Sequence, residues 1–229
     1  MRVPLTRFGL PQVAVFPLLV LVLMAVLFVI FRPARWLFPA EAVLFLVLLW
    51  MLSFFRDPSR TIVPDEMTLY SPADGTVTDI SFVDDSALGL AGIPVRALRI
   101  GIFLSIFSVH INRSPCSVRI EKVAYKKGRF INAMSPDSGR INESNDVLMV
   151  RLAEPKDRLL VRQVSGAIAR HIVCEAREAA EYDQGEPFGM IKFGSRTELY
   201  LPAGDHFVVS VKIGDKVRAG LTSMVRYRP

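Results

Sequence analysis

The sequence has 229 residues, is 51% hydrophobic, and carries 28 lysines and arginines against 22 acidic residues. This modest excess of positive charge is spread along the chain without the aromatic-basic motif of a nucleic-acid module, so nucleic-acid binding is not expected. Its two cysteines, Cys116 and Cys174, lie far apart and form no Cys-x-x-Cys pair, which argues against a zinc site or a disulfide scaffold. We interpret both as buried thiols.

The first part of the chain is strongly apolar. Residues 13–31 form an almost uninterrupted hydrophobic run, close to the ~20 residues that a helix needs to cross a bilayer. No small-residue cleavage site precedes Arg32, so we predict a membrane span rather than a signal peptide. A second run, residues 36–55, is also long enough, although Pro39 and Glu41 interrupt its first turns.

Together the two runs predict a membrane-embedded helical hairpin over residues 1–55, followed by a separate domain over residues 56–229. A hairpin returns the chain to its starting side, which then holds Arg2, Arg7, Arg56 and Arg60, with Arg32 and Arg35 opposite. The positive-inside rule therefore places the C-terminal domain on the cytoplasmic face of the cell (inner) membrane. A shallow hairpin that enters one leaflet is an open alternative, and it leaves the domain on the same face.

From Leu69 onward, short apolar runs alternate with Gly, Pro, Asp and Asn, a pattern typical of a strand-rich domain. The predicted strands cover residues 75–83, 95–103, 117–124, 146–152, 158–164, 191–193, 198–201, 207–211 and 221–226. Residues 165–170 fit either a short helix or more strand, and two segments, 71–77 and 213–220, are predicted hairpin turns. The predicted fold class is α+β, with a predominantly antiparallel β domain after the membrane helical hairpin.

Gly194 and Ser195 are the first candidate for chemistry. A serine hydroxyl can attack the carbonyl before it if the turn is strained, and glycine reaches dihedral angles closed to other residues. An isolated Gly-Ser pair is nevertheless usually an ordinary turn. His110 is a candidate base and Asp74 a candidate group to orient it. Taken singly, Asp74 would be a solvated turn residue and His110 a packed histidine at a strand end.

A set of separated sequence segments favours catalytic over structural roles for Ser195, His110 and Asp74. The segments are residues 54–60 (FFRDPSR), 71–77 (SPADGTV), 107–115 (FSVHINRSP), 128–133 (GRFINA), Asn142-Glu143 with Asn145, 166–170 (GAIAR), 185–195 (GEPFGMIKFGS) and 214–220 (GDKVRAG). In this order they resemble the phosphatidylserine decarboxylase family, in its short self-cleaving Gly-Ser form, over roughly residues 54–226.

The resemblance implies cleavage between Gly194 and Ser195. Residues 1–194 would form a β chain and residues 195–229 an α chain, held together as a heterodimer. Ser195 would become a covalent pyruvoyl cofactor that accepts electrons as phosphatidylserine loses CO2 and becomes phosphatidylethanolamine. The catalytic His and Asp of the family correspond to His110 and Asp74. Some members carry a second His where this chain has Phe107, so any role of that imidazole is absent here or supplied otherwise, and we expect a single histidine to move the protons. The expected partners are the lipid substrate and the bilayer, and no metal is implied.

Two other functions are open to the residues alone. The two predicted turns resemble those of biotinyl and lipoyl carrier domains, and Met190-Ile-Lys192 resembles a carrier lysine, which suggests a membrane-tethered carrier or binding module. Asp74 and Lys192 lie too far apart in the sequence for so small a domain. A serine hydrolase with an intact Ser195 is the other alternative, but the Gly-x-Ser-x-Gly elbow is missing.

The remaining polar and aromatic residues receive structural interpretations. His171 and His206 are expected to be structural or surface residues, and the Asp84-Asp85 pair a solvated loop. Phe103, Phe107 and Ile111 could line a slot for lipid chains, but we expect them in the core.

Overall fold

The computed structural model describes residues 5–9, 12–32, 34, 36–84, 93, 96–135, 137–167, 171–192 and 194–228. The chain divides into two compact units, Met1–Ser59 and Arg60–Pro229. The sequence placed the boundary after residue 55.

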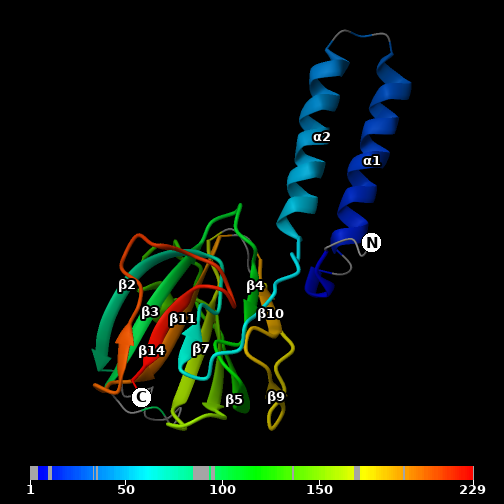
Figure 1. The fold of residues 1–229 in the computed structure, drawn as a ribbon. Coiled ribbons are helices and arrows are strands. Elements are labelled where there is room, and N and C mark those ends of the chain that lie inside the picture. Colours follow the sequence, from blue (N-terminus) through cyan, green and yellow to red (C-terminus); the bar gives the residue numbers. More distant parts are fainter. Residues whose placement is uncertain are drawn as a thin grey trace. The chain divides into compact units, whose positions relative to one another are not determined.

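The first unit is helical. A short 3-10 turn, η1 (Arg7–Gly9), precedes α1 (Gln12–Phe31) and α2 (Leu37–Phe54), and Figure 1 shows the two long helices side by side. Both are long and apolar enough to cross a membrane. Pro39 falls in the first turn of α2, where backbone N–H groups have no partner within the helix, so it does not break the helix. These helices confirm the predicted hairpin.

The second unit is built from antiparallel strands (Figure 1). The large sheet has eight strands in the order β13 (Lys216–Val217), β2 (Gly75–Asp84), β3 (Arg96–Leu104), β11 (Ser195–Pro202), β7 (Arg158–Val164), β6 (Ser144–Arg151), β5 (Val118–Lys126) and β9 (Glu181–Tyr182). A second sheet joins β1 (Thr68–Tyr70), β14 (Ser223–Tyr227) and β12 (Phe207–Val209). A third joins β4 (Ile111–Arg113), β10 (Pro187–Ile191) and β8 (Ile172–Cys174).

The core lies between the large sheet and the two small ones. Alternate residues of β3 and β11, such as Ile102 and Leu199, point into one cluster of buried side chains. Phe188 of β10 and Val225 of β14 enter the same cluster from the small sheets. A one-turn helix, α4 (Ser138–Ile141), contacts β7 and β11. This architecture confirms the predicted fold class.

Several local predictions need correction. The strand predicted at residues 191–193 is wrong, because β10 ends at Ile191 and Phe193 lies outside the described residues. Residues 71–74 form no hairpin, since they pass the chain from β1 in one sheet to β2 in another. Residues 165–167 are neither helix nor strand, and 168–170 lie outside the described residues. The short strands β1, β4, β8, β9 and β13 had not been predicted.

Candidate functional site

Ser195 is the first residue of β11, in the middle of the large sheet. It pairs with Leu104 of β3, and Arg196 pairs with Val164 of β7. Side chains alternate along a strand, so Ser195 and Thr197 share one face and Arg196 points to the other. Ser195 is fully buried, and its Oγ makes no hydrogen bond to any residue that the structure describes.

The backbone before Ser195 is held in an unusual conformation. Gly194 has a φ of 62°, in the left-handed region that disfavours side chains. Its carbonyl oxygen lies so close to Gly166 that a Cβ on that residue would overlap it. Asn142 fixes the neighbouring loop, because its Nδ2 donates to the carbonyl oxygen of Ser165 at 2.8 Å. The peptide bond after Gly194 therefore sits in a notch that a glycine at position 166 leaves open.

His110 is fully buried in the connection between β3 and β4. Its Nδ1 lies 2.8 Å from the carbonyl oxygen of Ser108. A carbonyl can only accept, so Nδ1 carries the hydrogen and the buried Nε2 is the basic nitrogen of the neutral ring. The backbone N–H of Ile191, at the end of β10, donates to the carbonyl oxygen of His110 at 3.1 Å. This bond ties the histidine segment to the run that leads to Ser195.

A chain of buried amides joins the same two segments. Asn112 Nδ2 donates to Thr197 Oγ1 at 2.9 Å, and Gln163 Nε2 donates to Asn112 Oδ1 at 2.9 Å. Asn145 Nδ2 extends the chain to Gln163 Oε1 at 3.2 Å. Asn112 lies two residues after the candidate base His110, and Thr197 lies two residues after Ser195 on the same face of β11. The network therefore fixes β4 against β11 in one register, since buried polar groups require such partners.

Asp74 lies just before β2, at the end of the large sheet where β11 begins. Thr76 pairs with Phe103 of β3, one residue from the partner of Ser195. The carboxylate of Asp74 accepts hydrogen bonds from Arg60 at 2.7 and 2.8 Å and from the N–H of Ala219 at 2.7 Å. The bonds of Asp74 that the structure describes go to Arg60 and Ala219, and its predicted action on His110 stays a prediction.

Sequence reasoning assigned Arg60 no role in the candidate site. The available signal was its place in the motif of residues 54–60.

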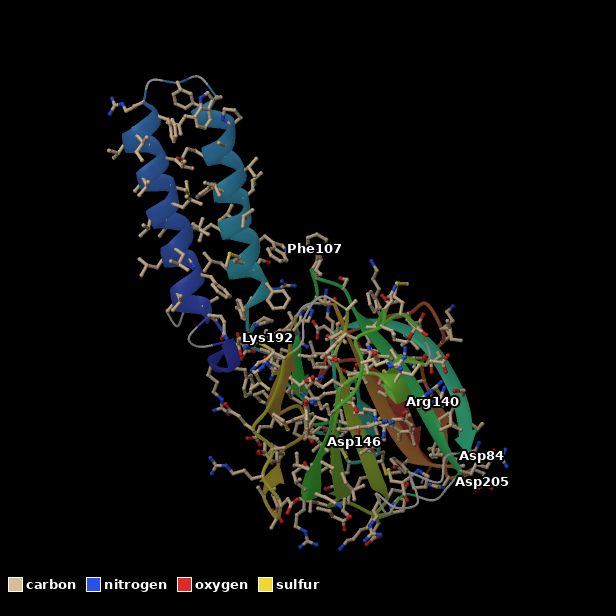
Figure 2. The ribbon with its side chains drawn as sticks, turned by 180° about the vertical axis from the view of Figure 1, so that it is seen from behind. Asp84, Phe107, Arg140, Asp146, Lys192 and Asp205 are labelled. Carbon is tan, nitrogen blue, oxygen red and sulfur yellow. The ribbon has the colours of Figure 1, made fainter. Side chains whose placement is uncertain are left out.

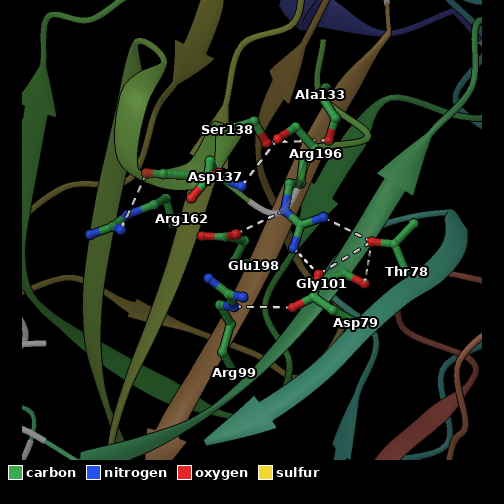
Figure 3. Close-up of polar contacts among 12 residues, drawn as sticks. Thr78, Asp79, Arg99, Gly101, Ala133, Asp137, Ser138, Arg162, Arg196 and Glu198 are labelled. Atoms are coloured by element: carbon green, nitrogen blue, oxygen red, sulfur yellow. Dashed lines mark hydrogen bonds and ion pairs between the residues drawn. The ribbon is translucent and has the colours of Figure 1, made fainter. Parts of the chain in front are cut away.

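On the opposite face of β11, Arg196 is buried in a network of charges (Figure 3). Its Nε donates to Glu198 Oε1 and its Nη1 to Thr78 Oγ1, each at 2.8 Å, and its Nη2 pairs with Asp79. Arg99 binds the other oxygen of Asp79 at 3.0 Å. Burial alone would lower the pKa of Arg196, but the charge of Glu198 and the bond to Asp79 raise it. The residue after Ser195 is thus anchored across to β2.

The loop after β3 is exposed. Phe107 has 69% of its surface exposed and projects at the end of the sheet where β3 ends, while Asp84 and Asp205 mark the opposite end (Figure 2). The core position predicted for Phe107 is therefore wrong, whereas Ile111 is fully buried and Phe103 half-buried. Asp84 is exposed as expected, and Asp85 lies outside the described residues.

Lys192 does not suit a carrier. It is only 6% exposed, and burial lowers its pKa. A carrier lysine must project from a turn to reach its partners, so the structure counts against the carrier hypothesis.

The remaining candidates behave as structural residues. His206 Nε2 lies 2.9 Å from Asp157 Oδ2, and His171 is exposed. Of the two cysteines predicted to be buried, Cys116 is buried and Cys174 only partly so. Burial raises the pKa of Cys116 to about 12.

A buried serine behind a left-handed glycine, with a buried imidazole on the neighbouring segment, defines a candidate self-processing site. The sequence model of the phosphatidylserine decarboxylase family matches residues 47–224. A phosphatidylserine decarboxylase proenzyme of Rhodopirellula baltica is 38% identical over 227 residues, which cover 98% of this chain and 89% of that protein.

Proenzymes of the same name from Gluconacetobacter diazotrophicus and Carboxydothermus hydrogenoformans are each 41% identical. They cover 85% and 80% of this chain, and the match spans 83% of each relative. This chain belongs to the phosphatidylserine decarboxylase family, and it is a decarboxylase of the carboxy-lyase class.

Proposed function

We propose that the chain cuts itself between Gly194 and Ser195, and that the pyruvoyl group formed from Ser195 decarboxylates phosphatidylserine to phosphatidylethanolamine and CO2. The relatives bear the name of a proenzyme, which suits a chain that matures by processing. The observation that carries the proposal is the pairing of a buried Ser195 Oγ with a left-handed Gly194 whose carbonyl lies in the notch at Gly166.

In the cleavage we propose, Ser195 Oγ bonds to the carbonyl carbon of Gly194 while His110 Nε2 takes the hydroxyl proton. The bond to the Ser195 nitrogen then breaks as that nitrogen gains a proton, which leaves an ester. Loss of the Ser195 α-proton releases the carboxylate of Gly194. Water then hydrolyses the remaining dehydroalanyl end, with release of ammonia. Asp74 is assigned to stabilise His110 in its charged form.

The surroundings of Ser195 fit a small uncharged keto group. The side chain is fully buried, and among the described residues no charged group or hydrogen-bond donor contacts its Oγ. The pyruvoyl group supplies an electron-accepting carbonyl, which is the chemistry that decarboxylation of an amino acid needs. In turnover we assign His110 to return a proton to the substrate carbon that has lost CO2, because the hydrogen bond from Ile191 ties the buried histidine segment to the run that leads to Ser195.

We also propose that the two products stay together as an α–β heterodimer. The α chain, residues 195–229, would contain β11, which lies between β3 and β7 in the large sheet. It would also contain β14, which lies between β1 and β12. Separation of the α chain would break the pairing of β11 with β3 and β7 in the large sheet, and the pairing of β14 with β1 in the second sheet.

The location we propose is the inner cell membrane, with residues 1–55 embedded and the catalytic domain on the cytoplasmic face. The support is the pair of apolar helices and the placement of arginines at their ends. A lipid substrate that stays in the bilayer suits an enzyme tethered to it.

The test uses the full chain purified in detergent and mixed with phosphatidylserine. We expect two fragments on a denaturing gel and release of CO2 from the lipid, and an uncut, inactive Ser195→Ala variant. An intact wild-type chain that still releases CO2 would overturn the proposal. Biotin or lipoate on Lys192 of an uncut chain would favour the carrier alternative.

A further inference from the structure

The segment that opens the second unit, residues 60–65, we name the strap. It is neither helix nor strand, yet it is fixed to the catalytic domain along its length. The N–H of Asp65 donates to Gln184 Oε1 at 2.7 Å. The side chain of Ile62 packs against Gly185, where a Cβ would meet it. The strap therefore has a defined place in the unit.

Arg60 is the first residue of the strap and forms a bidentate ion pair with Asp74. Its Nη1 and Nη2 lie 2.7 and 2.8 Å from the two carboxylate oxygens, and Nη1 also contacts the carbonyl oxygen of Ala219. Both side chains are shielded, with 5% of Arg60 and 15% of Asp74 exposed. Two parallel bonds from a planar guanidinium fix the plane as well as the position of a carboxylate, which a lysine cannot do.

We infer that Arg60 is a positioning residue for self-cleavage, acting through Asp74. The inference rests on the proposed function, in which Asp74 supports the base His110. A carboxylate offers about four acceptor positions. Arg60 and the N–H of Ala219 fill three of them, two on Oδ1 and one on Oδ2. The position left on Oδ2 is the one through which Asp74 can act on an imidazolium.

The chain offers a matched control for this contact. Arg162 binds Asp146 in the same bidentate manner, at 2.6 and 2.8 Å, with 10% and 20% of the side chains exposed. Neither residue contacts Gly194 or Ser195 in the described structure. Loss of Arg162 thus removes a second shielded, bidentate ion pair away from the scissile bond, and the melting temperatures show whether the two variants lose similar stability.

The experiment follows self-cleavage of the full chain made by pulse-labelled cell-free translation into phosphatidylserine-containing vesicles. Arg60→Met, Arg60→Lys and Arg162→Met are compared with wild type, and folding is monitored in the same variants carrying Ser195→Ala. Because misplacing a catalytic group by ~1 Å costs ~100-fold, we expect Arg60→Met to slow cleavage by about that factor. Arg60→Lys should recover part of the rate, and Arg162→Met should cleave within ~3-fold of wild type at a similar loss of melting temperature.

The inference is overturned if Arg60→Met cleaves as fast as wild type. It is also overturned if Arg162→Met slows cleavage as much as Arg60→Met, since the effect would then follow stability alone. A third overturning result is an Arg60→Lys variant that cleaves as fast as wild type, because the planar bidentate contact with Asp74 would then not matter. Failure of the proposed function looks different: wild type itself stays uncut, or Ser195→Ala still yields both fragments.

Discussion

Replacing Gly166 with alanine tests the notch around the scissile bond. The new Cβ would overlap the carbonyl oxygen of Gly194, where an ordinary C···O contact needs about 3.3 Å or more. Either the carbonyl or the loop must therefore retreat by more than ~1 Å. Such a displacement at a reacting centre costs ~100-fold in rate, so we expect Gly166→Ala to accumulate as the uncut chain.

The assay is the fraction of cleaved chain against time on a denaturing gel. Gly204→Ala is the control, because the atoms nearest to its Cβ belong to the ring of the partly exposed His206, a side chain that can move. Both glycine variants are also placed in a Ser195→Ala background to compare melting temperatures. Cleavage of Gly166→Ala at the wild-type rate would refute the reasoning. So would a Gly204→Ala variant that is slowed equally.

Three further predictions concern stability and reactivity. Arg196→Met in the Ser195→Ala chain should lose ~3 kcal/mol or more in urea unfolding, because Glu198 keeps a buried charge without its main partner; a loss under ~1 kcal/mol would contradict this. Folding raises the pKa of Cys116 from 9.0 to about 12, so its contribution to stability is full below pH 9 and is lost as the pH rises through 12; a Cys116→Val variant should therefore show a shallower alkaline loss of melting temperature, and equal slopes would refute it. Phe107→Ala should change the free energy of unfolding by under ~0.5 kcal/mol, because 69% of the residue's surface is already exposed to solvent, and a loss above ~1 kcal/mol would contradict this.

The parts of the fold that sequence predicted are those with a strong local signal. The helices α1 and α2 follow from predominantly apolar runs of membrane-spanning length. Long strands such as β2 and β7 follow from apolar runs between turn residues. Strands of two or three residues, such as β4, are defined by their partners rather than by their own pattern. β10 was misplaced because Pro187 and Gly189 weaken any strand signal within it.

The sequence predicted which residues form the candidate site, but it did not predict which residues they contact. Ser195, His110 and Asp74 follow from motifs, but which cation binds Asp74 depends on a strap that crosses the domain. The burial of Arg196 could not be foreseen either, since an arginine is usually exposed. It became visible only when β11 was paired with β3, which brings Arg196 across to Asp79 of β2. Phe107 was misjudged because apolarity alone does not distinguish core from loop tip.

The most direct test of the central claim is the intact mass of the purified chain under denaturing conditions. Self-cleavage with pyruvoyl formation predicts two species, residues 1–194 and residues 195–229, the smaller lighter by one ammonia than a peptide with a serine end. That smaller species should also resist Edman degradation. A single uncut chain, or a smaller fragment that still begins with serine, would contradict the account.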